Sequence, residues 1–284
     1  MFCCVTRGDF IDTIRLMKYT EFIASSLGRA AEIARKNFGK VTSSKIKNGN
    51  SVHVLTETDL EIGSMIVEAV GKEFPDHNII DEEAGIIDND SEYTWVVDPI
   101  DGTSNFAQGV PQYGILLGLL ENGTPVAGGI SLPSLSELYI AEKGSGAFCN
   151  GRKITVSDEP ELSNSLIAYG IDGHKDDPGR TRKECKLLGS LVLEIRNLRS
   201  SNSVYDFAMV ACGKYGAFLN QTSKIWDNVA SQIIIEEAEG VHTDFYGKPI
   251  DYSDPLKKAG ENSTHCAAAP EVHSQIQTVI RNSE

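Results

Sequence analysis

The chain has 284 residues, of which 40% are hydrophobic and 23% are charged, a composition that excludes a disordered or fibrous protein. Its formal net charge is −14, so binding to bulk nucleic acid or to an anionic membrane is not expected. No stretch reaches the ~18–20 consecutive apolar residues of a membrane span, and the N-terminus lacks the apolar core of a signal peptide. The six cysteines are scattered without a CxxC spacing, which indicates neither a zinc site nor a disulfide framework. We therefore expect a reduced, cytoplasmic location.

The first 16 residues show no clear hydrophobic period. We expect residues 1–16 to form either a weakly ordered N-terminal extension or a lengthening of the first helix. Residues 17–284 contain no linker-like tract and no repeat, so they are predicted to form a single domain, with halves of about 17–155 and 156–284.

Two helices are predicted at the start of this domain. After Thr20, which can cap a helix, apolar and small residues recur at helical spacing as far as Ala34. Asp59 opens a second helical pattern that continues to Val70, and an acid is favourable at the N-terminal end of a helix.

The remaining elements predict an antiparallel first half and an alternating second half. In the first half, apolar runs bounded by turn residues predict strands at residues 78–81, 93–98, 114–120, 125–131, 138–141 and 146–154, and Glu121-Asn122-Gly123 is a strong hairpin signal. In the second half we predict strands at residues 165–170, 193–198 and 216–219, and helices at 203–212, 226–239 and 271–280. The fold class is therefore α+β, with layered sheets and helices in one compact unit.

Acidic residues concentrate where these elements begin or end. Four sets are found: Asp81-Glu82-Glu83, Asp98-Pro99-Ile100-Asp101, Asp227 and Asp59. Carboxylates at the mouth of apolar strands repel one another and are costly to desolvate unless a cation joins them. All-oxygen ligation selects a hard cation, and Mg2+ is the usual one.

The second set carries the sharpest signal. Asp98 and Asp101 lie three residues apart with Pro99 stiffening the turn, so that both carboxylates and the Ile100 carbonyl can point into one site. Gly102-Thr103 follows at a candidate helix N-terminus, where free backbone N–H groups suit a phosphate. A lone acid at a strand end is more often a turn former or a helix cap, but four sets are hard to explain in that way. Together they indicate metal-assisted phosphoryl hydrolysis.

Two segments carry a resemblance to a known family. Asp98-Pro99-Ile100-Asp101-Gly102-Thr103-Ser104-Asn105-Phe106 resembles the first signature of the inositol monophosphatase family, a group of magnesium-dependent, lithium-sensitive phosphomonoesterases. Residues 225–230 through 237–240 resemble the second signature. The similarity runs from about Tyr19 to the last helix, and it implies the layered α/β/α/β/α sandwich of the inositol-monophosphatase/fructose-bisphosphatase type.

The resemblance implies two Mg2+ ions. Glu82, Asp98 and the Ile100 carbonyl would hold the first ion, and Asp98, Asp101 and Asp227 the second. Glu82 could also help to hold a third, weaker ion.

The same resemblance implies direct attack by a metal-activated water, with no phosphoenzyme. The implied catalytic residues are Glu82 and the Thr103–Asp59 pair, and Glu83 would have a supporting role. The residues expected to contact the phosphate or the substrate are Asp101, Gly102, Thr103, Ser203, Asn220 and Asp227.

The chain departs from the family pattern at several positions. Asp81 stands where a glycine is usual, and it either adds charge to the metal site or caps the loop. Ser201-Asn202-Ser203 replaces a Gly-Ser/Thr-Ala motif, and Asn220 replaces a glutamate that binds substrate hydroxyls in inositol-specific members. Lys47 lies close to the expected position of an active-site lysine, with its spacing off by one residue.

The sequence therefore predicts a phosphoric monoester hydrolase that acts on a small polyol or sugar phosphate, with inositol monophosphate as the first choice. Histidinol phosphate, fructose 1,6-bisphosphate and 3′-phosphoadenosine 5′-phosphate are the alternative substrates, and residues 241–245 resemble a segment of histidinol phosphatases. A non-catalytic metal-binding regulatory subunit is the alternative of another class. The resemblance also implies a homodimer and lithium inhibition.

Overall fold

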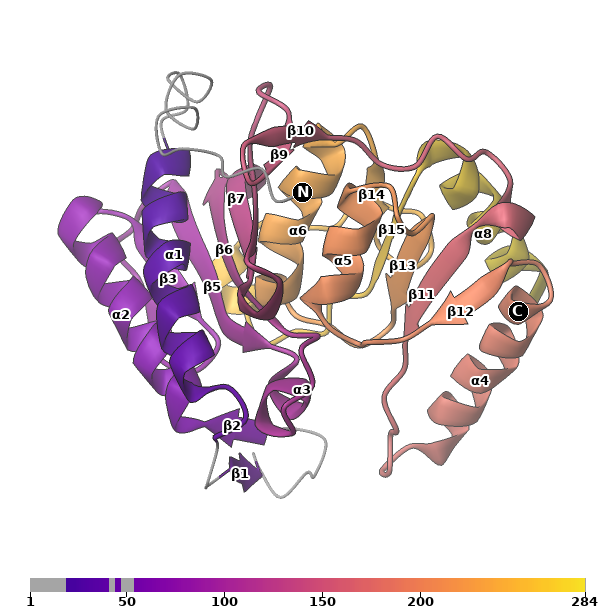
Figure 1. The fold of residues 1–284 in the computed structure, drawn as a ribbon, viewed down its shortest axis with the longest axis horizontal. Coiled ribbons are helices and arrows are strands. Elements are labelled where there is room, and N and C mark those ends of the chain that lie inside the picture. The colour runs from indigo at the N-terminus through magenta and orange to yellow at the C-terminus, as the bar shows by residue number, and fades with distance from the viewer. Residues whose placement is uncertain (1–18, 41–43, 47–53, 284) are drawn as a thin grey trace, which may run out of the picture.

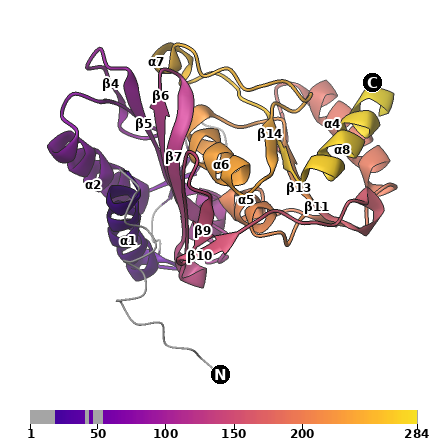
Figure 2. The same ribbon diagram turned by 90° about the horizontal axis from the view of Figure 1, so that it is seen from above.

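The computed structural model describes residues 19–40, 44–46 and 54–283, which form five layers of helices and sheets (Figures 1 and 2). The predicted extension 1–16 and Lys47 lie outside the described residues. Within these ranges no helix is both long enough and apolar enough to cross a membrane. The order of the layers in Figure 2 confirms the expected α/β/α/β/α sandwich.

The outermost layer of the first half consists of two helices that cover one face of the larger sheet. These helices are α1 (Thr20–Asn37) and α2 (Glu57–Glu73). The helix α1 begins at Thr20 itself, so Tyr19 occupies the cap position that was predicted for Thr20. The buried side chains of α1 recur at helical spacing, and they present one apolar face to the sheet.

The larger sheet confirms the antiparallel first half. Its strand order is β10-β9-β8-β7-β6-β5-β3-β4, and the described pairs are antiparallel except for the parallel pair β3–β5. The strands are β3 (Asn78–Asp81), β4 (Gly85–Ile87), β5 (Tyr93–Asp101), β6 (Gly114–Glu121), β7 (Thr124–Leu132), β8 (Glu137–Glu142), β9 (Ala147–Cys149) and β10 (Arg152–Ile154). A short separate pair, β1 (Ser44–Ile46) and β2 (Val54–Thr56), precedes α2.

The smaller sheet has the mixed order β12-β11-β13-β15-β14. Its strands are β11 (Leu166–Gly170), β12 (Asn197–Arg199), β13 (Ala217–Asn220), β14 (Val241–Thr243) and β15 (His265–Ala268). Strand β11 runs parallel to both β12 and β13, whereas β15 is antiparallel to its neighbours. The second half therefore alternates helices with strands, as expected.

Two helices fill the space between the sheets, and two cover the far face of the smaller sheet (Figure 2). The inner pair is α5 (Val204–Ala211) and α6 (Ile225–Glu237), and the outer pair is α4 (Pro178–Val192) and α8 (Pro270–Ser283). Short helices α3 (Thr103–Ala107) and α7 (Pro255–Lys258) lie in connections. The inner helices bury most of their residues because they are packed between the two sheets.

Two predicted strands are wrong. Residues 146–154 form the two paired strands β9 and β10 in place of one strand. Residues 193–198 were expected to form a strand, but Leu193 directly follows α4 and is 85% exposed, and the strand β12 begins only at Asn197. The helix α4 was not predicted, although Asp177 caps it by accepting a hydrogen bond from the backbone N–H of Arg180 and Pro178 is its first residue. Most of its residues are not buried, so its hydrophobic period is weak.

The inner helix α6 approaches the larger sheet closely at a glycine. A Cβ atom on Gly118 of β6 would lie 2.7 Å from Cγ1 of Val229 and 2.8 Å from the backbone nitrogen of Ala230. Both contacts are shorter than ordinary van der Waals distance, so glycine lets α6 sit at this depth. Because Asp227 lies at the start of the same helix, this packing fixes the position of a predicted site residue.

We predict that Gly118→Ala lowers the free energy of unfolding by ~1–3 kcal/mol, because an overpacked site must displace either the sheet or α6. Denaturant unfolding of the purified protein measures this change. Gly28→Ala on α1 is the control: a Cβ there meets nothing within 4 Å, so this change should leave stability equal or raise it by up to ~1 kcal/mol. Equal stability of the Gly118→Ala variant and the wild type would contradict the packing argument.

Candidate active site

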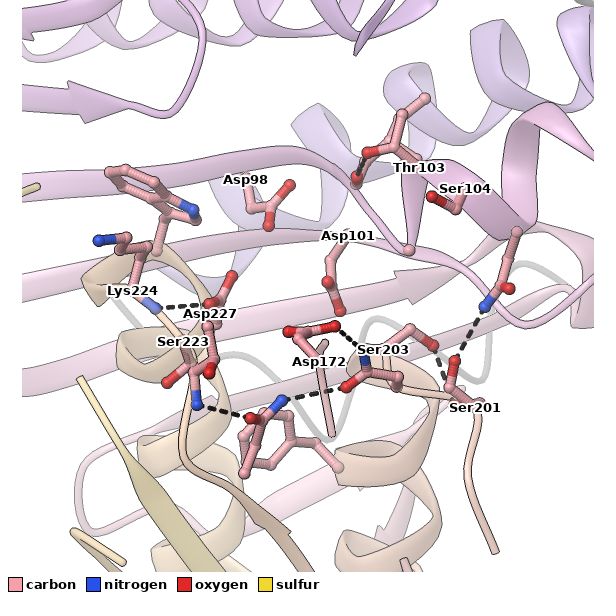
Figure 3. A pocket seen from close by; sticks show the side chains of 18 of the residues that line it. Asp98, Asp101, Thr103, Ser104, Asp172, Ser201, Ser203, Ser223, Lys224 and Asp227 are labelled. Atoms are coloured by element: carbon pink, nitrogen blue, oxygen red, sulfur yellow. Dashed lines mark hydrogen bonds between the residues drawn. The ribbon is translucent and has the colours of Figure 1, made fainter. Parts of the chain in front are cut away.

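A polar cavity of about 280 Å3 lies where the two sheets and the inner helices converge (Figure 3). Its lining combines the end of β5, the start of α3, the end of β13, the loop after β11, and the N-terminal turns of α5 and α6. The predicted residues among its lining are Glu82, Asp98, Ile100, Asp101, Gly102, Thr103, Ser203, Asn220 and Asp227. Asp59 is buried, and it meets the cavity through Thr103.

A β-bulge aims Asp98 and Asp101 at the same place. On β6, Leu116 lies opposite Asp98 and Gly114 lies opposite Asp101, so three steps along β5 correspond to two along its partner. In a regular strand, residues three apart point to opposite faces, whereas the extra residue in a bulge restores them to one side. Pro99 lacks the N–H that a regular ladder would use, which favours the break at this point.

Asp227 joins these two acids from the helix α6. It is the third residue of the helix, and its Oδ2 accepts a hydrogen bond from the backbone N–H of Lys224 at 2.6 Å. Asp98, Asp101 and Asp227 each offer a carboxylate oxygen, and these oxygens lie within 4.8 Å of one another (Figure 3). Acids from two distant segments are thus brought together.

The electrostatics of this cluster are those of buried acids that lie close together. Burial raises the pKa of Asp98 well above its ordinary value, and the charges of neighbouring carboxylates raise it further. Burial and then the charge of Asp227 do the same for the pKa of Asp101. Burial also raises the pKa of Asp227 to about 6. In addition, Oδ1 of the buried Asp98 has no hydrogen-bond partner among the described residues.

These properties fit a hard cation. The cluster offers closely spaced oxygens, one of them buried and unpartnered within the described part of the chain. A cation would remove the repulsion and offset the desolvation cost. The sequence pointed to these acids, but it did not reveal the bulge that aligns them.

Glu82 and Ile100 extend the oxygen set. The backbone N–H of Glu82 donates to the Val97 carbonyl at 3.2 Å, which holds the turn after β3 beside β5. Burial is the largest cause of the raised pKa of Asp98, and the negative charge of Glu82 is the second largest. The carboxylate of Glu82 therefore lies close to the cluster. The Ile100 carbonyl accepts a hydrogen bond from Oγ1 of Thr103 at 2.8 Å, and a carbonyl oxygen has a second lone pair to offer.

The expected contact between Asp59 and Thr103 is present. Oγ1 of Thr103 lies 3.4 Å from Oδ1 of Asp59, while Oδ2 of Asp59 accepts from the backbone N–H of Thr56 at 3.0 Å. Asp59 therefore caps α2 with one oxygen and faces the site with the other. Burial raises the pKa of Asp59 to about 6. A hydroxyl donates one proton, so the bonds of Thr103 to Asp59 and to Ile100 are alternatives.

Gly102 is required by the turn that follows the cluster. Its φ of +82° lies in the left-handed region, and a Cβ atom there would lie 2.9 Å from the Cβ of Ser203. Oγ of Ser203 donates to the Gln112 carbonyl at 3.0 Å and lies 3.1 Å from Oγ of Ser201. The turn and the loop before α5 are thus packed directly together.

Asp81 was expected either to add charge to the metal site or to cap the loop, and its hydrogen bonds decide between these roles. Oδ1 of Asp81 accepts from the backbone N–H groups of Glu83 at 2.8 Å and Ala84 at 2.6 Å. Asp81 is buried, and it is not among the described residues that line the cavity. It therefore caps the loop that presents Glu82.

Sequence reasoning missed two acids, one that lines the cavity and one that is buried and bonds the loop before α5. Asp172 follows β11 by two residues and lines the cavity with Asn202 and Asn220 (Figure 3). The signal that identified the other acids, a carboxylate soon after a buried apolar strand, was present here as well. Asp206 on α5 is fully buried, and its Oδ2 accepts from the backbone N–H groups of Ser201 and Asn202, both at 3.1 Å.

Comparison with known proteins agrees with this architecture. The sequence profile described as "Inositol monophosphatase family" matches residues 16–281. The chain belongs to the inositol monophosphatase family. The family is one of phosphatases, and the acidic cluster of this member is a group that could bind a metal.

Similar family members carry different names. An Aquifex aeolicus (strain VF5) protein named fructose-1,6-bisphosphatase/inositol-1-monophosphatase is 31% identical over 255 residues, covering 88% of this chain and 93% of that relative. A Xylella fastidiosa (strain Temecula1 / ATCC 700964) protein named Nus factor SuhB is 31% identical over 259 residues, covering 88% and 92%. The solved structure of a Thermotoga maritima IMPase has a TM-score of 0.81 at 30% identity, covering 94% and 98%.

We predict a pH-dependent effect at Asp206, a buried acid of this family member that lies outside the acidic cluster. Burial raises the pKa of Asp206 to about 6, so the folded state holds this proton more tightly than the unfolded state. The stability that the protonated group contributes is present at low pH and is lost as the pH rises from about 4 through 6. The stability of the wild type relative to Asp206→Asn should therefore fall by ~1–3 kcal/mol between about pH 4.5 and pH 7.

Denaturant unfolding of both proteins across this pH range measures the difference. The change Asp90→Asn in an exposed turn is the matched control, and it should preserve the pH dependence of the wild type. A pH-independent difference for Asp206→Asn would show that its carboxyl titrates alike in the folded and unfolded states.

Proposed function

We propose that this protein is a Mg2+-dependent phosphomonoesterase of small polyol or sugar phosphates, with inositol monophosphate as the first choice of substrate. The observation that carries this proposal is the cluster of Asp98, Asp101 and Asp227 beside the Gly102-Thr103 turn. Such a group of acids can hold hard cations, and the adjoining turn offers backbone N–H groups to a phosphate.

The residues would divide the cations between them as the family resemblance implies. Glu82, Asp98 and the Ile100 carbonyl would hold one Mg2+, and Asp98, Asp101 and Asp227 a second, with Glu82 also able to help hold a third. When bound, Mg2+ neutralises phosphate charge, lowers the pKa of water and stabilises the leaving alkoxide. This reversal of the local field would let a chain with net charge −14 bind an anionic ester.

The protein's own groups would orient the substrate and move the proton. The N–H groups of Gly102 and Thr103 would donate to phosphate oxygens. Glu82 and the hydroxyl of Thr103 would orient the attacking water, and Oδ1 of Asp59, 3.4 Å away, would accept the hydroxyl proton of Thr103. The same hydroxyl also donates to the Ile100 carbonyl. Its proton would therefore turn from that carbonyl to Asp59 during the reaction.

The charge of the pocket helps to rank the alternative substrates. Of the described residues that line it, Lys224 is the one lysine or arginine, and its Nζ donates to the Gly260 carbonyl at 2.6 Å. This favours a monophosphate over fructose 1,6-bisphosphate and 3′-phosphoadenosine 5′-phosphate, which carry a second phosphate. Residues 241–245, which resemble a histidinol phosphatase segment, are not among the described lining residues, so they give histidinol phosphate no support.

The lining of the cavity favours an enzyme over a non-catalytic regulatory subunit. A non-catalytic regulatory subunit would be expected to lack a metal ligand, whereas the whole expected ligand set is present in the sequence and lines the cavity.

The relative named Nus factor SuhB is the observation that favours a protein partner. The cytoplasmic location, the homodimer and the lithium inhibition are proposals that rest on the family resemblance.

We predict that Asp98→Asn lowers Mg2+-dependent phosphate release more than ~100-fold, because loss of a direct ligand should exceed the ~10–100-fold effect of an outer-shell change. Thermal unfolding without Mg2+ should show a fold at least as stable as the wild type, since the change removes a buried charge from a repelling cluster. The control is Asp90→Asn, which removes one exposed charge. Near-wild-type hydrolysis by Asp98→Asn would sink the assignment of the metal site.

The substrate is tested by a panel of inositol 1-phosphate, histidinol phosphate, fructose 1,6-bisphosphate and 3′-phosphoadenosine 5′-phosphate. Phosphate release is measured at several Mg2+ concentrations, with and without Li+. We expect one monophosphate to be hydrolysed far faster than the rest. Mg2+ binding without hydrolysis of any substrate would instead favour the regulatory subunit.

A further inference from the structure

The wall of the cavity beside the acidic cluster carries a directed chain of hydrogen bonds (Figure 3). The backbone N–H of Thr222 donates to Oδ1 of Asn220 at 2.7 Å, and Nδ2 of Asn220 donates to Oδ1 of Asn202 at 3.1 Å. Nδ2 of Asn202 then donates to Oδ1 of Asp172 at 3.0 Å. Each amide thus accepts at its oxygen and donates at its nitrogen, and the chain ends on a carboxylate.

This chain is held from behind by packed backbone. The carboxylate of the buried Asp206 accepts from the N–H groups of Ser201 and Asn202, and Asn202 has a left-handed φ of +53°. The strand β11 ends in glycine, and a Cβ atom on Gly170 would overlap Oδ1 of Asn202. The amides therefore occupy space that a side chain at Gly170 would take, and they hold Asp172 in a defined place.

Because these hydrogen bonds all run in one direction, the last group is an acceptor, the carboxylate of Asp172, which lines the cavity. A carboxylate accepts up to about four hydrogen bonds, so the bond from Asn202 leaves Asp172 with capacity for donors on a bound molecule. Burial is the main cause of the raised pKa of Asp227, and the negative charge of Asp172 adds to it, so the two acids lie near one another. Asn220, in contrast, uses both ends of its amide within the wall.

The two ends of the cavity differ in what they can bind. The metal ligands and the Gly102-Thr103 turn would take the phosphate, and so the alcohol part of the ester is left to the wall that carries Asp172. That wall offers an anionic acceptor, while the one lysine or arginine among the described lining residues, Lys224, is bonded to the Gly260 carbonyl. Hydroxyl donors fit such a wall, whereas a second phosphate would meet a like charge.

We propose that Asp172 determines the leaving-group specificity of this site: it accepts hydrogen bonds from hydroxyls of a polyol and repels a second phosphate. The inference rests on the proposed phosphomonoesterase function and names the substrate class as polyol monophosphates over bisphosphates. Asn202 and Asn220 are positioning residues, because they act by fixing the carboxylate of Asp172.

The test compares Asp172→Asn with the wild type on inositol 1-phosphate and fructose 1,6-bisphosphate at saturating Mg2+. Asparagine keeps an oxygen that can accept from Asn202 but removes the charge. A hydrogen bond to a charged acceptor is stronger than one to a neutral acceptor, so kcat/KM for inositol 1-phosphate should fall about 10-fold, mainly through KM. The kcat/KM for fructose 1,6-bisphosphate should stay level or rise, because the variant lacks the charge that would repel the second phosphate.

The matched control is Asp176→Asn, which removes an exposed charge from the same loop and should change neither value. Equal losses on both substrates, together with a shifted Mg2+ dependence, would assign Asp172 to the metal site and overturn the proposal. Unchanged kinetics of Asp172→Asn on both substrates would overturn it as well.

A second readout separates this inference from the proposed function. Ligand-observed NMR titration with myo-inositol, in the presence of Mg2+ and inorganic phosphate, measures binding of the alcohol without turnover. We expect binding to weaken in Asp172→Asn and to be unchanged in Asp176→Asn. If the wild type hydrolyses neither ester but this pattern holds, the reaction assignment fails and the specificity role stands. If the two variants bind myo-inositol alike, the specificity role fails whatever the wild type hydrolyses.

Discussion

Repulsion between desolvated carboxylates is the constraint on which the rest of this structure depends. Asp98, Asp101 and Asp227 hold oxygens within 4.8 Å of one another, and burial raises the pKa of each. Such an arrangement is unfavourable by itself and must be maintained by favourable packing elsewhere. The two sheets with α5 and α6 between them supply that packing, because the inner helices are buried along most of their length. The fold can thus be understood as the frame that holds mutually repelling acids together in a cluster that could bind a metal.

Local backbone features convert this frame into a defined geometry. The bulge in β5 puts Asp98 and Asp101 on one side of the strand, and the first turn of α6 presents Asp227 to them. The cap of α2 does the same for Asp59, which bonds its own helix and Thr103 with different oxygens. Asp227 and Asp59 each accept a hydrogen bond at the start of their own helix and also face the site, so formation of the helix also positions the acid.

The sequence was informative where a signal is local. The acids around Asp98 could be identified because they directly follow a run of apolar residues, and the order of the layers followed from the family resemblance and the strand pattern. The helix α4 was missed because few of its residues are buried and its period is weak, even though Asp177 and Pro178 mark its start. The wall that ends in Asp172 could not be predicted, because the hydrogen bonds of Asn202 join residues far apart in the chain.

The two walls of the cavity are built from different parts of the chain, and this separation has a consequence for how such a protein can change. Most of the acidic cluster comes from the end of β5. Asp172, in contrast, lies in the loop after β11, Asn202 in the loop between β12 and α5, and Asn220 at the end of β13. Mutations in those loops can reshape the alcohol side without disturbing the residues proposed to activate water. One scaffold can in this way diversify among related esters over evolutionary time while its reaction chemistry stays fixed.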